Sequence, residues 1–152
     1  MRAVRPVLAI GFLTVVVVPN ALAWVQVRGM TTFVEGGVRT PPPEQLTLVD
    51  RAWTLLTGVR LTRPVNASTP ADHGLPSTAW TTPSRGETLA IWTVPGGPGN
   101  AVLFHGYGGT RDQLLDVVPW WVDHGYTVHL VDFPGSGGSS GNTTSIGARE
   151  AE

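Results

Sequence analysis

The sequence predicts a mixed α/β fold preceded by an apolar N-terminal helix. Three observations predict it: residues 101–133 read as strand, helix and strand, a hairpin pattern stands before them, and residues 6–27 carry no charge. The length of 152 residues suffices for one domain of ordinary size. We expect residues 1–27 to be a signal peptide or membrane anchor, 28–75 a connector and 76–152 the N-terminal part of the α/β domain.

The N-terminal segment has the pattern of an export signal. Arg2 and Arg5 precede the uncharged residues 6–27, of which 7–18 are the most apolar. A cleaved signal peptide would use Pro19 as a helix breaker and residues 21–23 as an A-x-A site, whereas an uncleaved anchor would use the whole run to span the membrane. Both alternatives place the rest of the chain outside the cell, either membrane-anchored or secreted.

Composition excludes several classes of function. The formal net charge is -1, and all ten basic residues are Arg and form no cluster, so nucleic acid is not expected as a partner. The chain has no Cys, which removes disulfides and thiolate metal sites. His105, His124 and His129 lack the spacing of metal ligands, so we expect neither a metal nor a cofactor.

The connector contains one predicted helix over about residues 43–57. Prolines 41–43 suit a first turn, Glu44 lies near its positive end, and Gly58 can end it. We expect this helix to pack on the domain or to lie against the membrane. Residues 64–76 are rich in turn formers and predict a loop.

From Ser77 onward the pattern changes to strands. Residues 77–82 and 87–94 flank the four residues 83–86, which predicts a hairpin with a four-residue turn, and residues 101–104 form a third strand. Thr110 can cap a helix that ends at Gly125 and is kinked or divided by Pro119. The continuous apolar run 126–133 then predicts a central parallel strand covered on both faces.

The stretch GGSSG, residues 137–141, matches the Gly-x-Ser-x-Gly spacing of a serine nucleophile. A nucleophile elbow requires a strand that ends at the Ser and a helix that begins at once. Pro134 and at least seven small residues separate Phe133 from the next helical start, near Thr144 or Ser145, so Ser139 is expected to be a loop serine. Ser140 also spoils a dinucleotide-binding fingerprint, and a phosphate-binding P-loop would need a Lys.

The segments AVLFHGYGGT and VHLVDFPGSGGSSGNTTSIGAREAE resemble the α/β-hydrolase superfamily, and most resemble its bacterial membrane-associated serine hydrolases. The resemblance implies that His105-Gly106 opens the oxyanion loop and that Asp132 to Ser139 form a loop beside the active site. The implied site residues are His105, Gly106, Tyr107, Gly108 and Gly109 in the oxyanion loop, and Asp132, Gly135, Gly137 and Ser139 in the adjacent loop.

The resemblance also implies that the serine, acid and histidine of the triad lie beyond Glu152. We therefore expect a fragment of a serine hydrolase that acts on an ester, thioester or amide of a small or lipid-like acyl compound and is inactive alone. The backbone N–H of Tyr107 is the candidate oxyanion donor, although a simple tight turn before Thr110 fits the same residues. His105 is expected to orient the loop and Asp132 to hold the loop that follows it.

A second hypothesis stays open at this point. The chain could instead be a non-catalytic binding or scaffold protein that keeps part of the α/β fold at the membrane surface. A downstream strand ending in Gly-x-Ser-x-Gly would distinguish the enzyme from the scaffold.

Overall fold

The computed structural model describes residues 10–147, and the chain forms two compact units. The first unit comprises residues up to 33 together with 37–62, and the second comprises 34–36 together with the residues from 63 onward. Each unit is described separately below. The predicted fold class, a mixed α/β sheet preceded by an apolar helix, is confirmed.

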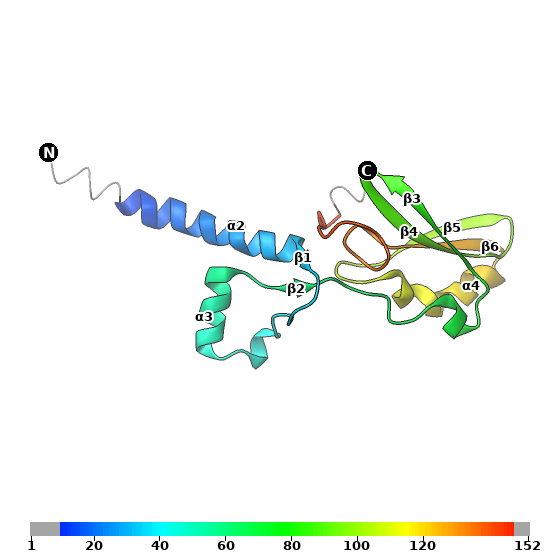
Figure 1. Cartoon of the computed structure of the whole chain (residues 1–152), viewed down its shortest axis with the longest axis horizontal. Helices are drawn as coiled ribbons and strands as arrows, with labels where there is room; N and C mark the ends of the chain where they lie inside the picture. Colours follow the sequence, from blue (N-terminus) through cyan, green and yellow to red (C-terminus); the bar gives the residue numbers. More distant parts are fainter. Residues whose placement is uncertain (1–9, 148–152) are drawn as a thin grey trace. The chain divides into compact units, whose positions relative to one another are not determined.

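The first unit begins with a helical run from Ile10 to Thr31 (Figure 1). It consists of a π-helix, η1 (Leu13–Val17), followed by the α-helix α2 (Val18–Thr31). The signal-peptide alternative required Pro19 to break the helix, but the helical run continues through Pro19. This proline follows a π-helical turn in which Val18 N–H bonds to Leu13 O, and it occupies the first turn of α2, where a missing N–H is tolerated. By length and composition alone, the run could cross a membrane.

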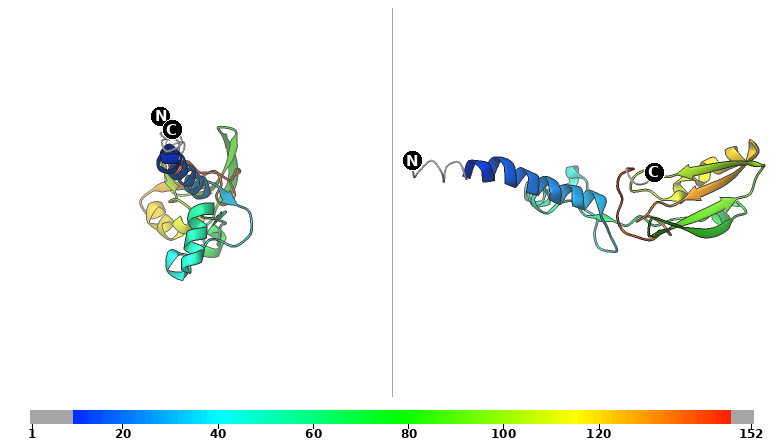
Figure 2. Two further views of the ribbon diagram at one scale, coloured as in Figure 1. Left: turned by 90° about the vertical axis from the view of Figure 1, so that its left-hand side faces the viewer. Right: turned by 90° about the horizontal axis from the view of Figure 1, so that it is seen from above.

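The predicted connector helix is shorter than expected. A 3₁₀ turn, η2 (Pro43–Gln45), is followed by the separate helix α3 (Leu48–Thr57). The α-helix begins at Leu48 because Thr47 and Asp50 form a reciprocal capping box, and it ends at Gly58, whose φ is +84°. Figure 2 and Figure 1 together show α3 running crosswise to α2. The short strands β1 (Phe33–Val34) and β2 (Leu61–Thr62) pair with each other.

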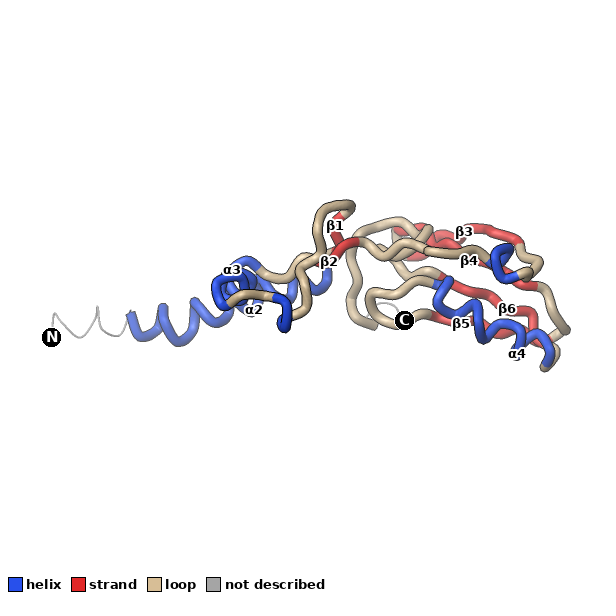
Figure 3. The backbone as a smooth tube through the Cα atoms, turned by 90° about the horizontal axis from the view of Figure 1, so that it is seen from below, coloured by secondary structure: helices blue, strands red, loops and turns tan. Residues whose placement is uncertain are grey.

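A four-stranded sheet forms the second unit (Figure 3). Its spatial order is β3 (Thr78–Ser84), β4 (Glu87–Val94), β6 (Tyr126–Val131), β5 (Gly99–Phe104). The β5–β6 pair is parallel, as predicted for a strand-helix-strand unit, and the other two pairs are antiparallel. Since β5 and β6 are parallel, their carboxyl ends meet at one edge of the sheet.

The hairpin turn between β3 and β4 has two residues, not the predicted four. Pro83 and Ser84 still pair with β4, and only Arg85 and Gly86, with φ of +52° and +84°, form the turn. Two positive φ values in succession are typical of a type I′ turn, whose twist matches a hairpin. Pro83 is tolerated in β3 because this strand lies at the edge of the sheet.

The predicted helix after Thr110 is divided. Residues Arg111–Val117 form the 3₁₀ helix η4, and α4 (Val118–Asp123) follows with Pro119 in its first turn. Figure 3 shows α4 along β5 and β6, where Leu115 and Val118 pack into a buried cluster on one face of the sheet. The cluster is completed by Trp92, Val94, Val128 and Leu130.

The opposite face of the sheet carries a chain of hydrogen bonds across all four strands. Trp80 Nε1 donates to Thr93 Oγ1 at 2.8 Å, Thr93 Oγ1 contacts His129 Nδ1 at 2.9 Å, and His129 Nε2 contacts Asn100 Oδ1 at 3.1 Å. Val102 and Phe104 on this face are half exposed. Within the described residues the helical layer packs on the other face only, but Ile91 and Val131 on this face are buried. The predicted covering of the central strand on both faces is therefore met by helices on one face and, on the other, only at this end of the strand.

The segment 64–76, predicted as a loop, contains a short 3₁₀ helix, η3 (Pro70–His73), which is capped by Thr69 and ends at Gly74. At the other end of the unit, the helix expected to start near Thr144 or Ser145 is not present within the described residues. Ile146 has a φ of +55° and Gly147 a φ of +95°, which is turn geometry. Residues 148–152 of the expected helix lie outside the described part of the chain.

Candidate active-site loops

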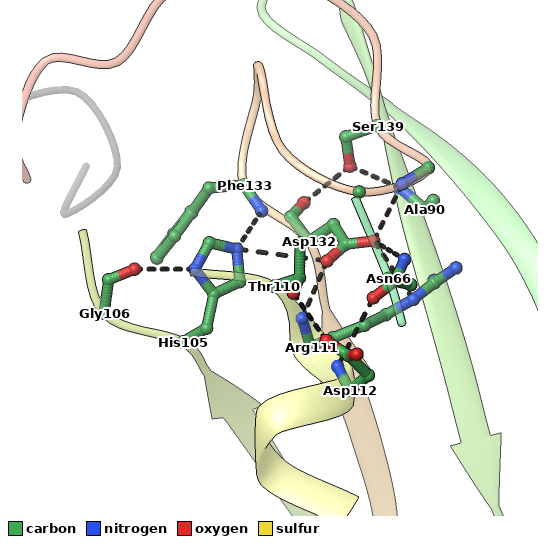
Figure 4. Close-up of polar contacts among 12 residues, drawn as sticks. Asn66, Ala90, His105, Gly106, Thr110, Arg111, Asp112, Asp132, Phe133 and Ser139 are labelled. Carbon is green, nitrogen blue, oxygen red and sulfur yellow. Dashed lines mark hydrogen bonds and ion pairs between the residues drawn. The ribbon is translucent and has the colours of Figure 1, made fainter. Parts of the chain in front are cut away.

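Asp132 ties together the segments at the carboxyl edge of the parallel strands (Figure 4). It directly follows β6, and its side chain is fully buried. Its Oδ1 accepts a hydrogen bond from Arg111 N at 2.8 Å, and its Oδ2 accepts from Gly138 N at 2.9 Å and from Asn66 Nδ2 at 3.0 Å. One carboxylate thus fixes the start of η4, the glycine-rich loop and the loop before η3.

The Arg111 side chain is the buried counter-charge of Asp132. Its Nε lies 3.1 Å from Asp132 Oδ2, and its guanidinium carbon lies 3.8 Å from the centre of the Trp92 ring. Burial lowers the pKa of Arg111, an effect that the nearby Asp132 and Asp112 carboxylates partly offset. Among the described residues, neither Nε nor Nη1 finds an aligned hydrogen-bond acceptor. The cation therefore depends on Asp132 and on the Trp92 ring for its stabilisation.

His105 links the end of β5 to the end of β6. Its Nδ1 lies 2.8 Å from Gly106 O and its Nε2 accepts a hydrogen bond from Phe133 N at 3.1 Å. Because a carbonyl can only accept and an amide N–H can only donate, the ring is neutral with its proton on Nδ1. Nε2 lies 4.0 Å from Asp132 Oδ1, too far for a hydrogen bond. The imidazole is thus used to position two loops and is not paired with a carboxylate.

Ser139 is buried between the glycine-rich loop and β4. Its Oγ donates to Asp132 O at 2.6 Å and accepts from Ala90 N at 2.8 Å. Only 2% of its surface is exposed, and no His ring nitrogen is among its hydrogen-bond partners in the described chain. A serine nucleophile needs an accessible hydroxyl and an adjacent base, so this geometry suits a structural hydroxyl.

Gly137 is required at its position by the Asp132 side chain. Its φ is +49°, and a Cβ placed on it would lie 2.0 Å from Asp132 Oδ2. Gly135, with a φ of +78°, donates its N–H to Ser140 O at 2.9 Å, and this hydrogen bond joins the two ends of the glycine-rich loop. The two glycines allow the backbone to wrap closely around the buried carboxylate.

The glycine-rich loop is also held from the segment that precedes η3. The Arg63 guanidinium donates to the carbonyl oxygens of Ser139 and Gly141 and lies 3.5 Å from that of Gly137. Glu35 contributes an exposed ion pair to the same guanidinium at 3.8 Å. This one side chain satisfies several loop carbonyls, which makes the loop a fixed structure.

The predicted oxyanion loop, residues 105–109, forms a tight turn at the end of β5. Gly109 N donates to Gly106 O at 3.0 Å, and Gly108 has a φ of +68°. Tyr107 lies in this turn with half of its surface exposed. The turn borders a pocket of about 210 Å³. The residues that line the pocket are His105, Tyr107, Phe133, Thr144, Ile146 and Gly147.

Asp112 joins the start of η4 to the loop before η3. Its Oδ2 accepts from Ala67 N at 2.6 Å and from Ser68 N at 3.2 Å, and its Oδ1 accepts from the Thr110 hydroxyl. Burial raises the pKa of Asp112, but these hydrogen bonds, together with one from the Gln113 backbone, outweigh that effect, so the net shift is downward.

Sequence reasoning missed four residues of this network: Asn66, Arg111, Asp112 and Arg63. Asn66 lies 66 positions from its partner Asp132, and Arg63 lies 76 positions from Ser139. The only local signal was the Thr110-Arg111-Asp112 sequence, in which an Asp follows a helix cap by two positions. Within residues 10–147, no group of three His, Asp or Glu side chains could hold a metal ion.

Comparison with known proteins points to hydrolases. No protein-family model and no curated protein matches the chain. Among solved structures, an esterase from Pyrococcus furiosus is 27% identical, superimposes with a TM-score of 0.51 and is matched over 58% of this chain and 35% of its own. An α/β hydrolase from a Penicillium species is 31% identical over 44% of this chain and 25% of its own, with a TM-score of 0.38. The chain therefore spans about a third of the length of the esterase that it resembles.

Proposed function

We propose that this chain is the N-terminal part of a serine hydrolase that cleaves an ester, thioester or amide through an acyl-enzyme. The observation that carries the proposal is the His105 bridge between the ends of β5 and β6, which holds the 105–109 turn at the carboxyl edge of the parallel strands. Ligands of open α/β sheets bind at this edge. The likeness to the esterase, at 27% identity, supports the same assignment.

The role proposed for the turn is electrostatic. Acyl transfer passes through a tetrahedral intermediate whose oxygen becomes negative, and backbone N–H groups aimed at this oxygen stabilise it. The N–H of Tyr107 is the proposed donor. Gly106 and Gly108 on either side of Tyr107 permit the unusual backbone angles that such a turn requires, and the +68° φ of Gly108 uses that freedom.

The nucleophile is proposed to lie on a further strand of the full-length protein. Ser139 does not fit this role, because both hydrogen-bonding directions of its hydroxyl are used by Asp132 O and Ala90 N. Asp132 does not fit the triad acid, because its carboxylate is occupied by Arg111, Gly138 and Asn66. The two side chains instead hold the glycine-rich loop to β4, to the start of η4 and to the loop before η3.

The proposed substrate is a small or lipid-like acyl compound, and the proposed location is the outer surface of the membrane. The pocket beside Tyr107 is lined by Phe133 and Ile146, which suits an apolar group. The helical run Ile10–Thr31 has the length and composition of a span, and Arg2 and Arg5 before it favour the cytoplasmic side. A secreted form would follow if the segment is cleaved after Ala23.

The test uses the product of the complete reading frame, labelled with a fluorophosphonate probe that reacts with activated serines. Labelling is expected to persist in Ser139→Ala and to be lost when a downstream elbow serine is replaced. Tyr107→Pro, which removes the backbone N–H, should slow labelling roughly 100- to 1,000-fold, whereas the matched variant Tyr107→Phe keeps the N–H and should label normally.

Labelling that disappears only in Ser139→Ala would contradict the proposal. A folded full-length protein with no reactive serine would instead favour the non-catalytic scaffold. Equal labelling rates of Tyr107→Pro and Tyr107→Phe would remove the oxyanion role from this N–H while leaving the hydrolase assignment in place.

A further inference from the structure

Helix α3 has a sharply divided surface. At 100° per residue, its large apolar side chains fall on one continuous arc, and its polar side chains fall on the other. Between 58% and 81% of each large apolar residue is exposed. The apolar arc consists of Leu48, Val49, Ala52, Trp53, Leu55 and Leu56. The polar arc consists of Asp50, Arg51, Thr54 and Thr57. A ten-residue helix with this much exposed apolar surface needs a partner.

The end of α3 packs against the C-terminal part of α2 within the same unit. Gln26 Nε2 donates to Thr54 O at 2.8 Å and to Leu55 O at 2.9 Å. The backbone of α2 also comes close to the residues that follow α3, since a Cβ on Gly29 would lie 2.4 Å from Val59 O. The position of α3 along α2 is therefore fixed at residues 25–29.

This part of α2 has the features of a membrane–water boundary. The uncharged run ends at Arg28, whose guanidinium carbon lies 5.5 Å from the centre of the Trp24 ring. Tryptophan and arginine are both enriched where a span leaves the hydrocarbon, because each has an apolar body and a polar end. The level of α3 is thus the level at which α2 would meet the headgroups.

The orientation of α3 matches that level. Figures 1 and 2 show α3 crosswise to α2, so a membrane crossed by α2 would contain the axis of α3 roughly in its plane. Thr54 is the one half-buried residue of α3 and lies at the α2 contact, on the polar arc. The apolar arc is consequently turned away from α2, toward the surroundings that flank the span.

We propose that α3 is an interfacial helix whose apolar arc is buried in the outer leaflet of a lipid bilayer. The polar arc carries one acidic and one basic residue, Asp50 and Arg51, so its charge gives no preference for anionic lipid. Burial of apolar surface alone drives the contact, and phosphatidylcholine is a sufficient partner. The inference rests on the proposed membrane span and does not depend on the hydrolase activity.

The experiment uses the absence of cysteine from the chain, which makes single-cysteine labelling clean. Leu56→Cys and Val49→Cys report on the apolar arc, Thr57→Cys is the adjacent polar-arc control, and Val16→Cys reports on the span. Each variant of the full chain carries an environment-sensitive fluorophore and is reconstituted into phosphatidylcholine vesicles. Quenching by nitroxide-labelled lipid is compared with quenching by aqueous iodide.

Labels at positions 16, 49 and 56 are expected to be quenched by the nitroxide lipid and protected from iodide, with the reverse pattern at position 57. If position 16 meets lipid while 49 and 56 remain open to iodide, the interfacial helix is wrong and the span stands. If 49 and 56 are shielded from both quenchers, the apolar arc is covered by protein and the proposal is overturned. If position 16 does not meet lipid, the span fails as well.

Discussion

Asp132 is the residue on which the candidate site depends most. Its buried carboxylate accepts hydrogen bonds from three separate segments and balances the buried charge of Arg111. Removing one partner of a buried ion pair is costlier than removing the pair, because an uncompensated charge stays in a poorly solvated place.

Asp132→Asn should therefore lower the free energy of unfolding by about 3–5 kcal/mol, measured by urea denaturation. The matched control is Asp116→Asn, since the Asp116 side chain is 90% exposed and should change stability by no more than about 0.5 kcal/mol. Equal denaturation midpoints for the two variants would show that Asp132 does not organise the loops.

Asp112 makes stability dependent on pH. Its pKa is lowered in the folded protein, so its contribution is fully present above its ordinary pKa and is lost as the pH falls through the folded value. Asp112→Asn is expected to be less stable than the parent protein at pH 6. That difference should shrink between about pH 5 and pH 2, because the parent loses the same contribution on protonation.

The control for this pH dependence is Asp123→Asn, which alters an exposed carboxylate on α4. Denaturation at pH 6 and pH 3 is the measurement for both variants. A stability difference between the parent and Asp112→Asn that stays constant with pH would contradict the assigned hydrogen bonds.

At the level of elements, the glycine-rich loop is shaped by one steric requirement. Gly137 combines a positive φ with a neighbouring carboxylate, since a Cβ on it would lie 2.0 Å from Asp132 Oδ2, whereas Gly74 has a φ of +68° and open space where its Cβ would lie. An Ala substitution at Gly74 therefore measures the cost of the backbone angle alone, whereas the same substitution at Gly137 adds the clash with Asp132.

Gly74→Ala should cost about 1 kcal/mol, the ordinary penalty of a side chain in the left-handed region. Gly137→Ala should cost clearly more and should expose the loop amides, including Gly138 N, to hydrogen exchange. Similar costs and similar exchange rates in the two variants would mean that the loop can move away from Asp132.

The elements differ in how far the sequence could predict them. The hairpin, the parallel pair and the break at Pro119 were predictable, because each depends on local patterns or on the geometry of proline. The turn length was wrong because Pro83 suggested a turn, although an edge strand accepts it. The network around Asn66 and Arg63 was beyond reach, because it joins residues more than 60 positions apart.

The same distinction applies to the candidate site. The positions of the site loops at the ends of β5 and β6 followed from the strand pattern together with the resemblance to α/β hydrolases. What the sequence could not supply was the hydrogen-bonding state of each side chain, such as the neutral tautomer of His105 that Phe133 N selects. The roles of Tyr107 and the two loops are predictions that follow from the proposed function.

At the scale of the whole molecule, the fate of the N-terminal segment decides where the protein works. We expect the segment to be retained, because Ala21 to Ala23 lie within the continuous helix α2 and Pro19 does not interrupt it. The chain should then stay in the membrane fraction after alkaline carbonate extraction, and its mass should include residues 1–23. A mature chain that starts at Trp24 and is found in the medium would establish the secreted alternative.

The two-residue turn between β3 and β4 also bears on how the sheet assembles in time. Its strands pair in immediate succession along the chain, so this hairpin can close within about 1–10 μs. The β4–β6 pair joins Thr93 to His129, so the chain between them, which includes η4 and α4, must form a closed loop before these strands can pair. Closing this longer loop costs more conformational entropy and takes longer. Refolding should therefore show an early hairpin, with protection of the Trp80 and Thr82 amides, which face β4, and a later step in which β6 docks and orders the loops around Asp132.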